Sequence, residues 1–158
     1  MDKKILTQLI SLEDEEREII GSIAKIESDI DRIGKIINRI EKGEMVRDKV
    51  YGGEGGTQGF VIEGVPTAEY TRRKSELLSK KMLLERRKDL LAERQKMVSE
   101  QKVLATEFIN GIEDSWMRRI VEMRCIEQMT WSDIAINLGI DEHYDSVRMA
   151  FNRFIDKD

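Results

Sequence analysis

Apolar residues along the first forty positions recur at alternating steps of three and four. The series begins at Ile5, ends at Ile40 and has Glu16 as its only polar member. This spacing is the heptad seam of a coiled coil, so a long helix is predicted, with Gly43 where a C-terminal cap is expected. The ten apolar positions are Ile5, Leu9, Leu12, Ile19, Ile23, Ile26, Ile30, Ile33, Ile37 and Ile40.

A second long helix is predicted from Thr67 to Asn110. Pro66 and Thr67, followed by Glu69 in the first turn, form a helix start signal. Basic side chains lie between successive apolar pairs, and their aliphatic stems can lie along apolar surface while their charged ends reach water or a carboxylate. The apolar pairs recur every seven residues: Leu83–Leu84, Leu90–Leu91, Met97–Val98 and Leu104–Ala105. Tyr70 and Leu77 continue the same spacing towards the N-terminus of the helix.

The two helices have similar lengths and opposite net charges. Residues Met1–Met45 contain 8 basic and 11 acidic side chains, a net charge of −3, whereas Thr67–Asn110 contain 11 and 7, a net charge of +4. An antiparallel helical hairpin uses both properties, because it aligns the two lengths and brings opposite charges together. Ten apolar positions are more than a half-basic partner helix needs to cover. We therefore also expect a homo-oligomer formed through the N-terminal coil.

The connector between the helices, residues 46–65, has a different composition. Two short runs of β-favouring residues flank the glycine-rich stretch Gly52–Gly56, which predicts a small β-hairpin at the tip of the coil. Glycine-rich loops also bind phosphate groups in nucleotide-binding proteins. A flexible turn is the preferred interpretation, because no Lys-Ser or Lys-Thr follows the glycines and no strand-to-helix unit surrounds them.

Composition supports a chain of long amphipathic helices. Charged residues make up 37% of the sequence, aromatic residues 6%, and there is one proline. No apolar run approaches the roughly 20 residues that span a bilayer, and the N-terminus does not resemble a secretory signal. Cys125 is the single cysteine, which fits a reducing compartment. We expect a cytoplasmic, mainly all-α protein without membrane contact.

Shorter helices are predicted in the last part of the chain, residues 111–158, which we separate from a first domain of residues 1–110. Ile112, Trp116, Ile120 and Met123 mark one apolar helix face, with Val121 and Cys125 alongside. Thr130 followed by Asp133 is a capping-box-like start for the next helix. That helix directs Ile134, Ala135 and Leu138 inward and ends at Gly139.

A final helix follows the turn after Gly139. Its predicted buried face consists of Val147, Ala150, Phe151 and Phe154. Two short helices joined by a glycine-containing turn are typical of a helix-turn-helix, whose second helix enters the DNA major groove. The residues left pointing away from the core are the candidate DNA-binding residues: Ser146, Arg148, Met149, Asn152 and Arg153.

The sequence of this C-terminal part resembles sigma factor region 4. The resemblance rests on four segments: Met117–Arg124, Met129–Ala135, Leu138–Ile140 and Ser146–Met149. The whole chain is also similar to a family of phage and prophage proteins related to late-transcription activators of the RinA and ArpU type. These combine a long helical N-terminal part with a region-4-like module.

This resemblance implies a function in transcription. In sigma factors the helix that corresponds to residues 143–155 contacts the −35 promoter element. By this correspondence Arg148 and Met149 face DNA, and Arg153 contacts a phosphate. The implied partners are promoter DNA, bacterial RNA polymerase, or both.

Charge keeps a second interpretation open. Residues Gly111–Asp158 contain 6 basic and 10 acidic side chains, a net charge of −4, although affinity for DNA depends strongly on neutralised phosphates. The arginines of this region would then be a solvated face: Arg118, Arg119, Arg124, Arg148 and Arg153. In this alternative the chain is a coiled-coil scaffold with a protein-interaction module and without sequence-specific DNA binding.

No catalytic or metal site is predicted. His143 is the single histidine, and the acids next to it, Asp141, Glu142 and Asp145, are better explained by helix N-terminal charge preference than by metal binding. Cys125 lies among apolar residues without an evident base, so packing is the preferred role for its thiol. We expect neither a cofactor nor enzymatic activity.

Overall fold

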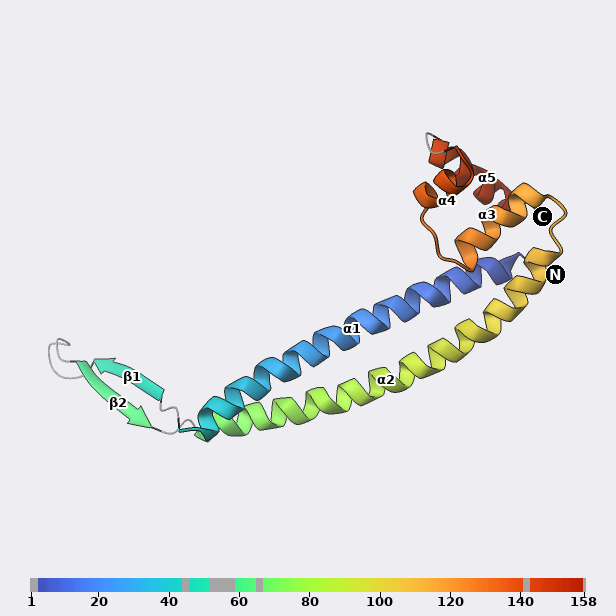
Figure 1. Cartoon of the computed structure of the whole chain (residues 1–158). Helices are drawn as coiled ribbons and strands as arrows, with labels where there is room; N and C mark the ends of the chain where they lie inside the picture. The colour runs from blue at the N-terminus through green and yellow to red at the C-terminus, as the bar shows by residue number, and fades with distance from the viewer. Residues whose placement is uncertain (1–2, 44–45, 52–58, 65–66, 141–142, 158) are drawn as a thin grey trace. The chain divides into compact units, whose positions relative to one another are not determined.

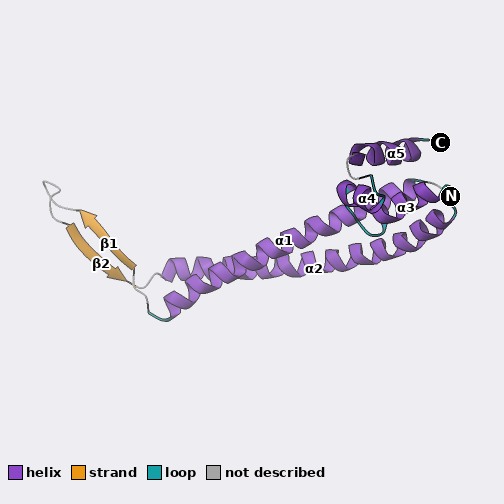
Figure 2. Cartoon of the chain, turned by 45° about the horizontal axis from the view of Figure 1, so that its top comes forward, coloured by secondary structure: helices purple, strands orange, loops and turns teal. Residues whose placement is uncertain are grey.

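The structure, a computed structural model, describes residues 3–43, 46–51, 59–64, 67–140 and 143–157. Most of the described residues are helical, which confirms the predicted fold class. The chain separates into two compact units, residues 19–90 (the central unit) and residues 1–18 with 91–158 (the terminal unit). Figures 1 and 2 show the elements in chain order: α1 (Lys4–Glu41), β1 (Val46–Tyr51), β2 (Gly59–Gly64), α2 (Thr67–Asn110), α3 (Ser115–Cys125), α4 (Trp131–Asn137) and α5 (Tyr144–Asp156).

Within the central unit, ion pairs join α1 and α2 in antiparallel order. Asp29 lies 2.8 Å from Lys80, and Glu41 accepts a hydrogen bond of 2.9 Å from the Tyr70 hydroxyl. Residue numbers therefore fall along α1 as they rise along α2. The hydrogen bond and charge of Lys80 lower the pKa of Asp29, and the Tyr70 hydroxyl, with Lys74, lowers that of Glu41.

The isoleucine seam of α1 is partly buried within one chain. In the central unit Ile19, Ile26, Ile33 and Ile37 are buried, with Ile33 completely inaccessible. Leu77 and Leu84 of α2 are half-buried, as are basic residues between them such as Lys80. Basic side chains thus occupy every second inward position of α2, so their stems can cover apolar surface while their charged ends reach the carboxylates of α1. Ile23, Ile30 and Ile40 of the seam are half-buried, and the homo-oligomer stays a prediction.

The connector contains two paired strands. β1 and β2 run antiparallel, in a register that extends from Val46 opposite Gly64 to Tyr51 opposite Gly59. The predicted turn at Gly52–Gly56 and the predicted start signal at Pro66 lie outside the described residues. α2 itself begins at Thr67 and ends at Asn110, as predicted.

Replacement of Ile33 tests whether buried isoleucines stabilise the central unit. Ile33→Ala should lower the free energy of unfolding by about 2–5 kcal/mol, because it removes a fully buried side chain and leaves a cavity. Lys35→Ala is the matched control on the same helix; it breaks an exposed pair of 2.7 Å with Asp31 and should change stability by less than about 0.5 kcal/mol. Chemical denaturation followed by circular dichroism measures both, and equal effects would contradict the assignment.

Candidate nucleic-acid interface

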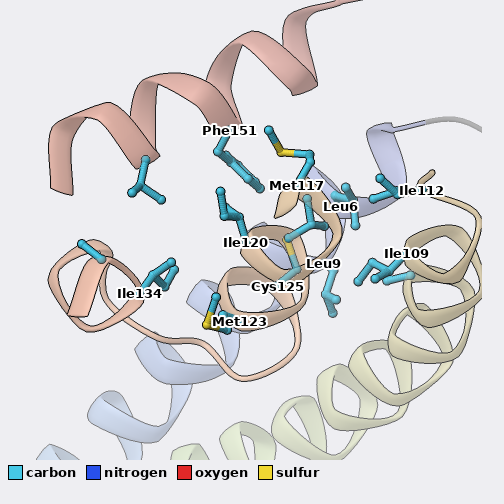
Figure 3. Packing of buried hydrophobic residues seen from close by; sticks show 14 of the residues in the cluster. Leu6, Leu9, Ile109, Ile112, Met117, Ile120, Met123, Cys125, Ile134 and Phe151 are labelled. Carbon is cyan, nitrogen blue, oxygen red and sulfur yellow. The ribbon is translucent and has the colours of Figure 1, made fainter. Parts of the chain in front are cut away.

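The three C-terminal helices share their core with both long helices. Leu6 and Leu9 of α1 are fully buried, and they belong to one apolar cluster with Ile109 of α2 and Ile120 of α3 (Figure 3). The compact unit therefore includes residues 1–18 and 91–110, and differs from the predicted domain boundary between residues 110 and 111. Local sequence patterns did not indicate this, because the contacts join segments about one hundred residues apart.

Helix α3 begins at Ser115, about one turn after Ile112, where the predicted apolar face began. The Asp114 carboxylate accepts hydrogen bonds from the backbone N–H groups of Trp116 and Met117, at 2.9 and 3.3 Å, and so caps the helix. Ile112 precedes the helix and does not share its phase. The buried side chain in the first turn is that of Met117, whereas Trp116 is 40% exposed. The predicted inward position of Trp116 is thus wrong by one residue.

The boundaries of α4 follow the predicted local signals. The Thr130 hydroxyl accepts a hydrogen bond of 3.2 Å from the backbone N–H of Asp133, which confirms the predicted N-cap. Gly139 ends the helix with φ of +72°, a left-handed conformation that glycine adopts without a Cβ clash. The N–H of Ile140 then donates to the carbonyl of Ala135 at 2.9 Å and closes the turn.

Helix α5 packs against α4 through an aromatic contact. The rings of Trp131 and Phe151 lie 5.2 Å apart at an angle of 58°. Val147 and Phe151 are buried, and Ala150 and Phe154 are half-buried. The predicted buried face of α5 is confirmed, and its opposite face is available for binding.

All five candidate DNA-binding residues of α5 are exposed. At 3.6 residues per turn, Arg148 and Arg153 lie roughly 140° apart around the helix, and Met149 and Asn152 lie between them. Exposed Asp145 and Asp156 occupy the same part of the surface. The structure thus brings the candidates together on one face of α5, and that face also contains two carboxylates.

The two arginines of this face have different surroundings. A terminal guanidinium nitrogen of Arg148 lies 3.0 Å from the carboxylate of Asp145, one turn earlier. Both side chains are more than half exposed, so this pair contributes little to stability. Arg153 lines an open hollow of about 580 Å³ beside Met117 and Phe154.

Two of the other arginines support the fold. Arg118 donates a hydrogen bond of 3.0 Å to the carbonyl of Ile112. Arg124 donates one of 2.9 Å to the carbonyl of Met129, and its guanidinium lies 4.7 Å from the centre of the Trp131 ring. These contacts hold the segments on either side of α3. Arg118 and Arg124 therefore have a structural role beyond that of solvated surface charges.

Electrostatically, the two units differ strongly. Residues 1–18 and 91–158 together contain 12 basic and 19 acidic side chains, a net charge of −7, whereas residues 19–90 contain 15 and 12, a net charge of +3. The exposed face of α5 with the candidate residues therefore lies in the more acidic part of the chain. Its arginines act against the field of the surrounding unit.

A buried carboxylate is the feature of this unit that sequence reasoning missed. Glu13 is only 3% exposed. It lies 3.1 Å from the ammonium group of Lys102 on α2 and accepts a hydrogen bond of 2.8 Å from the side-chain amide of Gln128, between α3 and α4. The missed signal is the Leu6–Leu9–Glu13 spacing, which places all three on one helix face.

The cysteine and histidine lie in different environments. Cys125 is fully buried, and burial raises the pKa of its thiol to about 12, with a lowering contribution from Arg124 and a raising one from Glu13. His143 is exposed at the N-terminus of α5, and its side chain makes no capping hydrogen bond. Two of its acidic neighbours, Asp141 and Glu142, lie outside the described residues.

The described residues contain no metal-binding cluster and no membrane-spanning helix, and the chain has no match among known proteins. Within the described ranges, no group of three or more His, Cys, Asp or Glu side chains could hold a metal ion. Over the same ranges, no helix has the length and apolar content to cross a bilayer. No protein-family profile, curated protein or solved structure matches the chain.

The buried thiol of Cys125 should be unreactive in the folded protein. The thiolate is the reactive form, and a pKa of about 12, against 9.0 for an ordinary thiol, keeps the group protonated at pH 8.5. Alkylation by iodoacetamide at that pH should be at least about tenfold slower in buffer than in denaturant, as followed by mass spectrometry. Equal rates would contradict the burial of Cys125.

Proposed function

We propose that this protein is a phage-type transcription regulator that binds promoter DNA through a helix-turn-helix made of α4 and α5. The observation that carries the proposal is the geometry of this pair. Two short helices pack through Trp131 and Phe151, turn at Gly139 and leave one face of the second helix exposed. A helix of this kind fits the major groove, which is about 12 Å wide.

The proposed roles of the five residues follow from their positions on α5. Arg148 and Asn152 lie close together around the helix and carry donors for base edges, whereas Arg153 lies at the far flank and contacts a phosphate. Met149 packs against base methyl groups, and Ser146 donates to the backbone near the start of the helix.

The negative charge of the terminal unit limits the affinity for DNA of a single chain. We therefore propose that RNA polymerase is a second partner, since contact with a DNA-bound enzyme adds binding energy without further cations. This arrangement agrees with the resemblance to sigma factor region 4 and to phage late-transcription activators. It also implies that the protein acts in the bacterial cytoplasm.

A second candidate function is favoured by exposed apolar side chains on the same two helices. Ile136 is 59% exposed, Tyr144 48% and Met149 50%. Apolar and aromatic side chains of this kind are typical of protein interfaces. In this alternative the α4–α5 pair binds another protein on a coiled-coil scaffold and does not recognise a DNA sequence.

Substitutions on α5 separate base recognition from phosphate contact. A target is first selected from fragments of the host and phage genomes, and binding is then measured by fluorescence anisotropy over a range of salt concentrations. Arg148→Ala should lower the preference for target over random DNA by about 1–3 kcal/mol. Arg153→Ala should weaken both DNAs alike and reduce the salt slope by about one unit. Asp145→Asn should tighten binding to both, because it removes a carboxylate and frees Arg148.

Lys96→Ala is the matched control, since Lys96 is an exposed cation of the same unit on α2. It should leave DNA binding unchanged. If the double variant Arg148→Ala/Arg153→Ala binds DNA like the parent while it keeps its helicity, the DNA-binding proposal is wrong. If DNA binding is unchanged in this way and Ile136→Ser/Met149→Ser no longer captures RNA polymerase in a pull-down, the interaction module is supported.

We propose that the protein self-associates through the outer face of α2. Leu78 is 62% exposed and Met82 54%, and they lie one turn apart on the side of α2 away from α1. This face is a second surface for association, besides the seam of the N-terminal coil, which α2 covers in part. Apolar side chains at this spacing form helix–helix contacts between chains.

Sedimentation equilibrium tests this self-association. The parent protein should sediment as a dimer or larger species at micromolar concentrations, and Leu78→Ser/Met82→Ser should sediment as the 18.4 kDa monomer. Ser75→Ala/Ser79→Ala, on the same helix, is the control and should not dissociate the oligomer. A monomeric parent protein over this range would contradict the proposal.

A further inference from the structure

Helix α1 contacts the C-terminal helices at two separate places in the terminal unit. Just before its first residue, the ammonium group of Lys3 donates a hydrogen bond to the carbonyl of Lys157, just after α5, and lies 4.9 Å from the centre of the Phe154 ring. Three turns later, Glu13 accepts the hydrogen bond from Gln128. The first contact holds the end of α5 and the second holds the segment that leads into α4.

The contact at Glu13 joins three parts of the chain. Its carboxylate belongs to α1, the ammonium group of Lys102 to α2, and the amide of Gln128 to the segment between α3 and α4. A carboxylate that is 3% exposed has lost most of its hydration, so it depends on these partners for compensation. When one partner moves, the charge remains buried without it, so the three segments are held in one arrangement.

The backbone at Gln128 is consistent with this requirement. Gln128 has φ of +56°, the only positive value at a described residue other than glycine. In this conformation the Cβ of glutamine comes close to a backbone carbonyl oxygen, which is unfavourable, so the surrounding structure must hold it. In the same segment the N–H of Met129 donates to the carbonyl of Met123 at 3.0 Å. The strained residue is therefore the one whose side chain reaches α1.

The segment that Gln128 belongs to determines where α4 begins. Thr130, the N-cap of α4, follows two residues later. Arg124 binds the carbonyl of Met129 and covers the ring of Trp131, which in turn packs against Phe151 of α5. A displacement of Gln128 is thus transmitted through contiguous contacts to α4 and then to α5.

From these contacts we infer that Glu13 is a positioning residue, which fixes the α4–α5 pair through Gln128 and makes its placement depend on the pairing of α1 with α2. A partner that separates Glu13 from Lys102 would release the α4–α5 pair without unfolding α3. This inference concerns the placement of the pair and holds for either of the functions proposed above.

Hydrogen exchange of the full-length protein in the absence of DNA tests the inference. Gln128→Gly removes the side-chain amide and at the same time relieves the left-handed backbone, so global stability should not fall. Amides of residues 126–140 should nevertheless exchange about tenfold faster or more, the factor for a lost hydrogen bond to a charged group. Amides near Ile109 of α2 should keep their exchange rates.

Glu13→Gln provides a second variant, because it keeps the shape and the ability to accept from Gln128 but removes the charge that Lys102 neutralises. It should increase exchange in residues 126–140 as well, by a smaller factor. The control is Glu16→Gln, at a half-buried position where the carboxylate accepts a hydrogen bond of 3.2 Å from Gln95. It should leave residues 126–140 unaffected.

Two outcomes would overturn the inference. One is that the amides of residues 126–140 exchange at the same rates in Gln128→Gly as in the control variant Glu16→Gln. The other is a uniform increase along α1 to α5, which would assign Glu13 to general stability. DNA binding is not part of this experiment, so a failure of the proposed function leaves its outcome unchanged.

Discussion

The C-terminal helices depend on burial that they cannot supply to one another. α4 has 7 residues, α3 has 11 and α5 has 13, and helices of this length are marginal without tertiary packing. Leu6, Leu9 and Ile109 complete their core from the two long helices. The exposed face of α5 therefore exists as a fixed surface only because the start of α1 and the end of α2 complete the core beneath it.

Charge and burial have separate functions in the α1–α2 pair. The ion pairs that join the helices are one third to one half exposed, so solvent screens them, and they select antiparallel order more than they stabilise it. Stability comes from buried isoleucines such as Ile33. Because lysine and arginine occupy half of the inward positions of α2, the helix covers the seam and still presents a positive edge to the acidic α1.

Local chemistry made part of this structure predictable. The ends of α2, the cap at Thr130 and the turn at Gly139 depend on neighbouring residues, and the sequence predicted each of them. The Leu6–Leu9–Glu13 spacing indicates that Glu13 lies on an apolar face of α1. Its partners, Lys102 and Gln128, are distant in sequence, so no local pattern could identify them. The exposure of all five candidate residues on α5 followed from helical periodicity. The ion pair of Asp145 with Arg148 depends on how the two side chains are oriented, which periodicity does not determine.

The carboxylate contacts of Asp145 and Glu13 in the terminal unit differ in how easily a partner can replace them. Asp145 and Arg148 are exposed, so water already screens their pair, and a phosphate or a guanine can take the place of the carboxylate at little cost. Glu13 is buried, and no external group can reach it while α1 and α2 stay paired. A ligand of α5 can therefore rearrange the binding surface without disturbing the core, whereas a change in the helix pair must alter the surface. In the inferred arrangement, coupling between the two regions runs through Glu13 and the segment that contains Gln128.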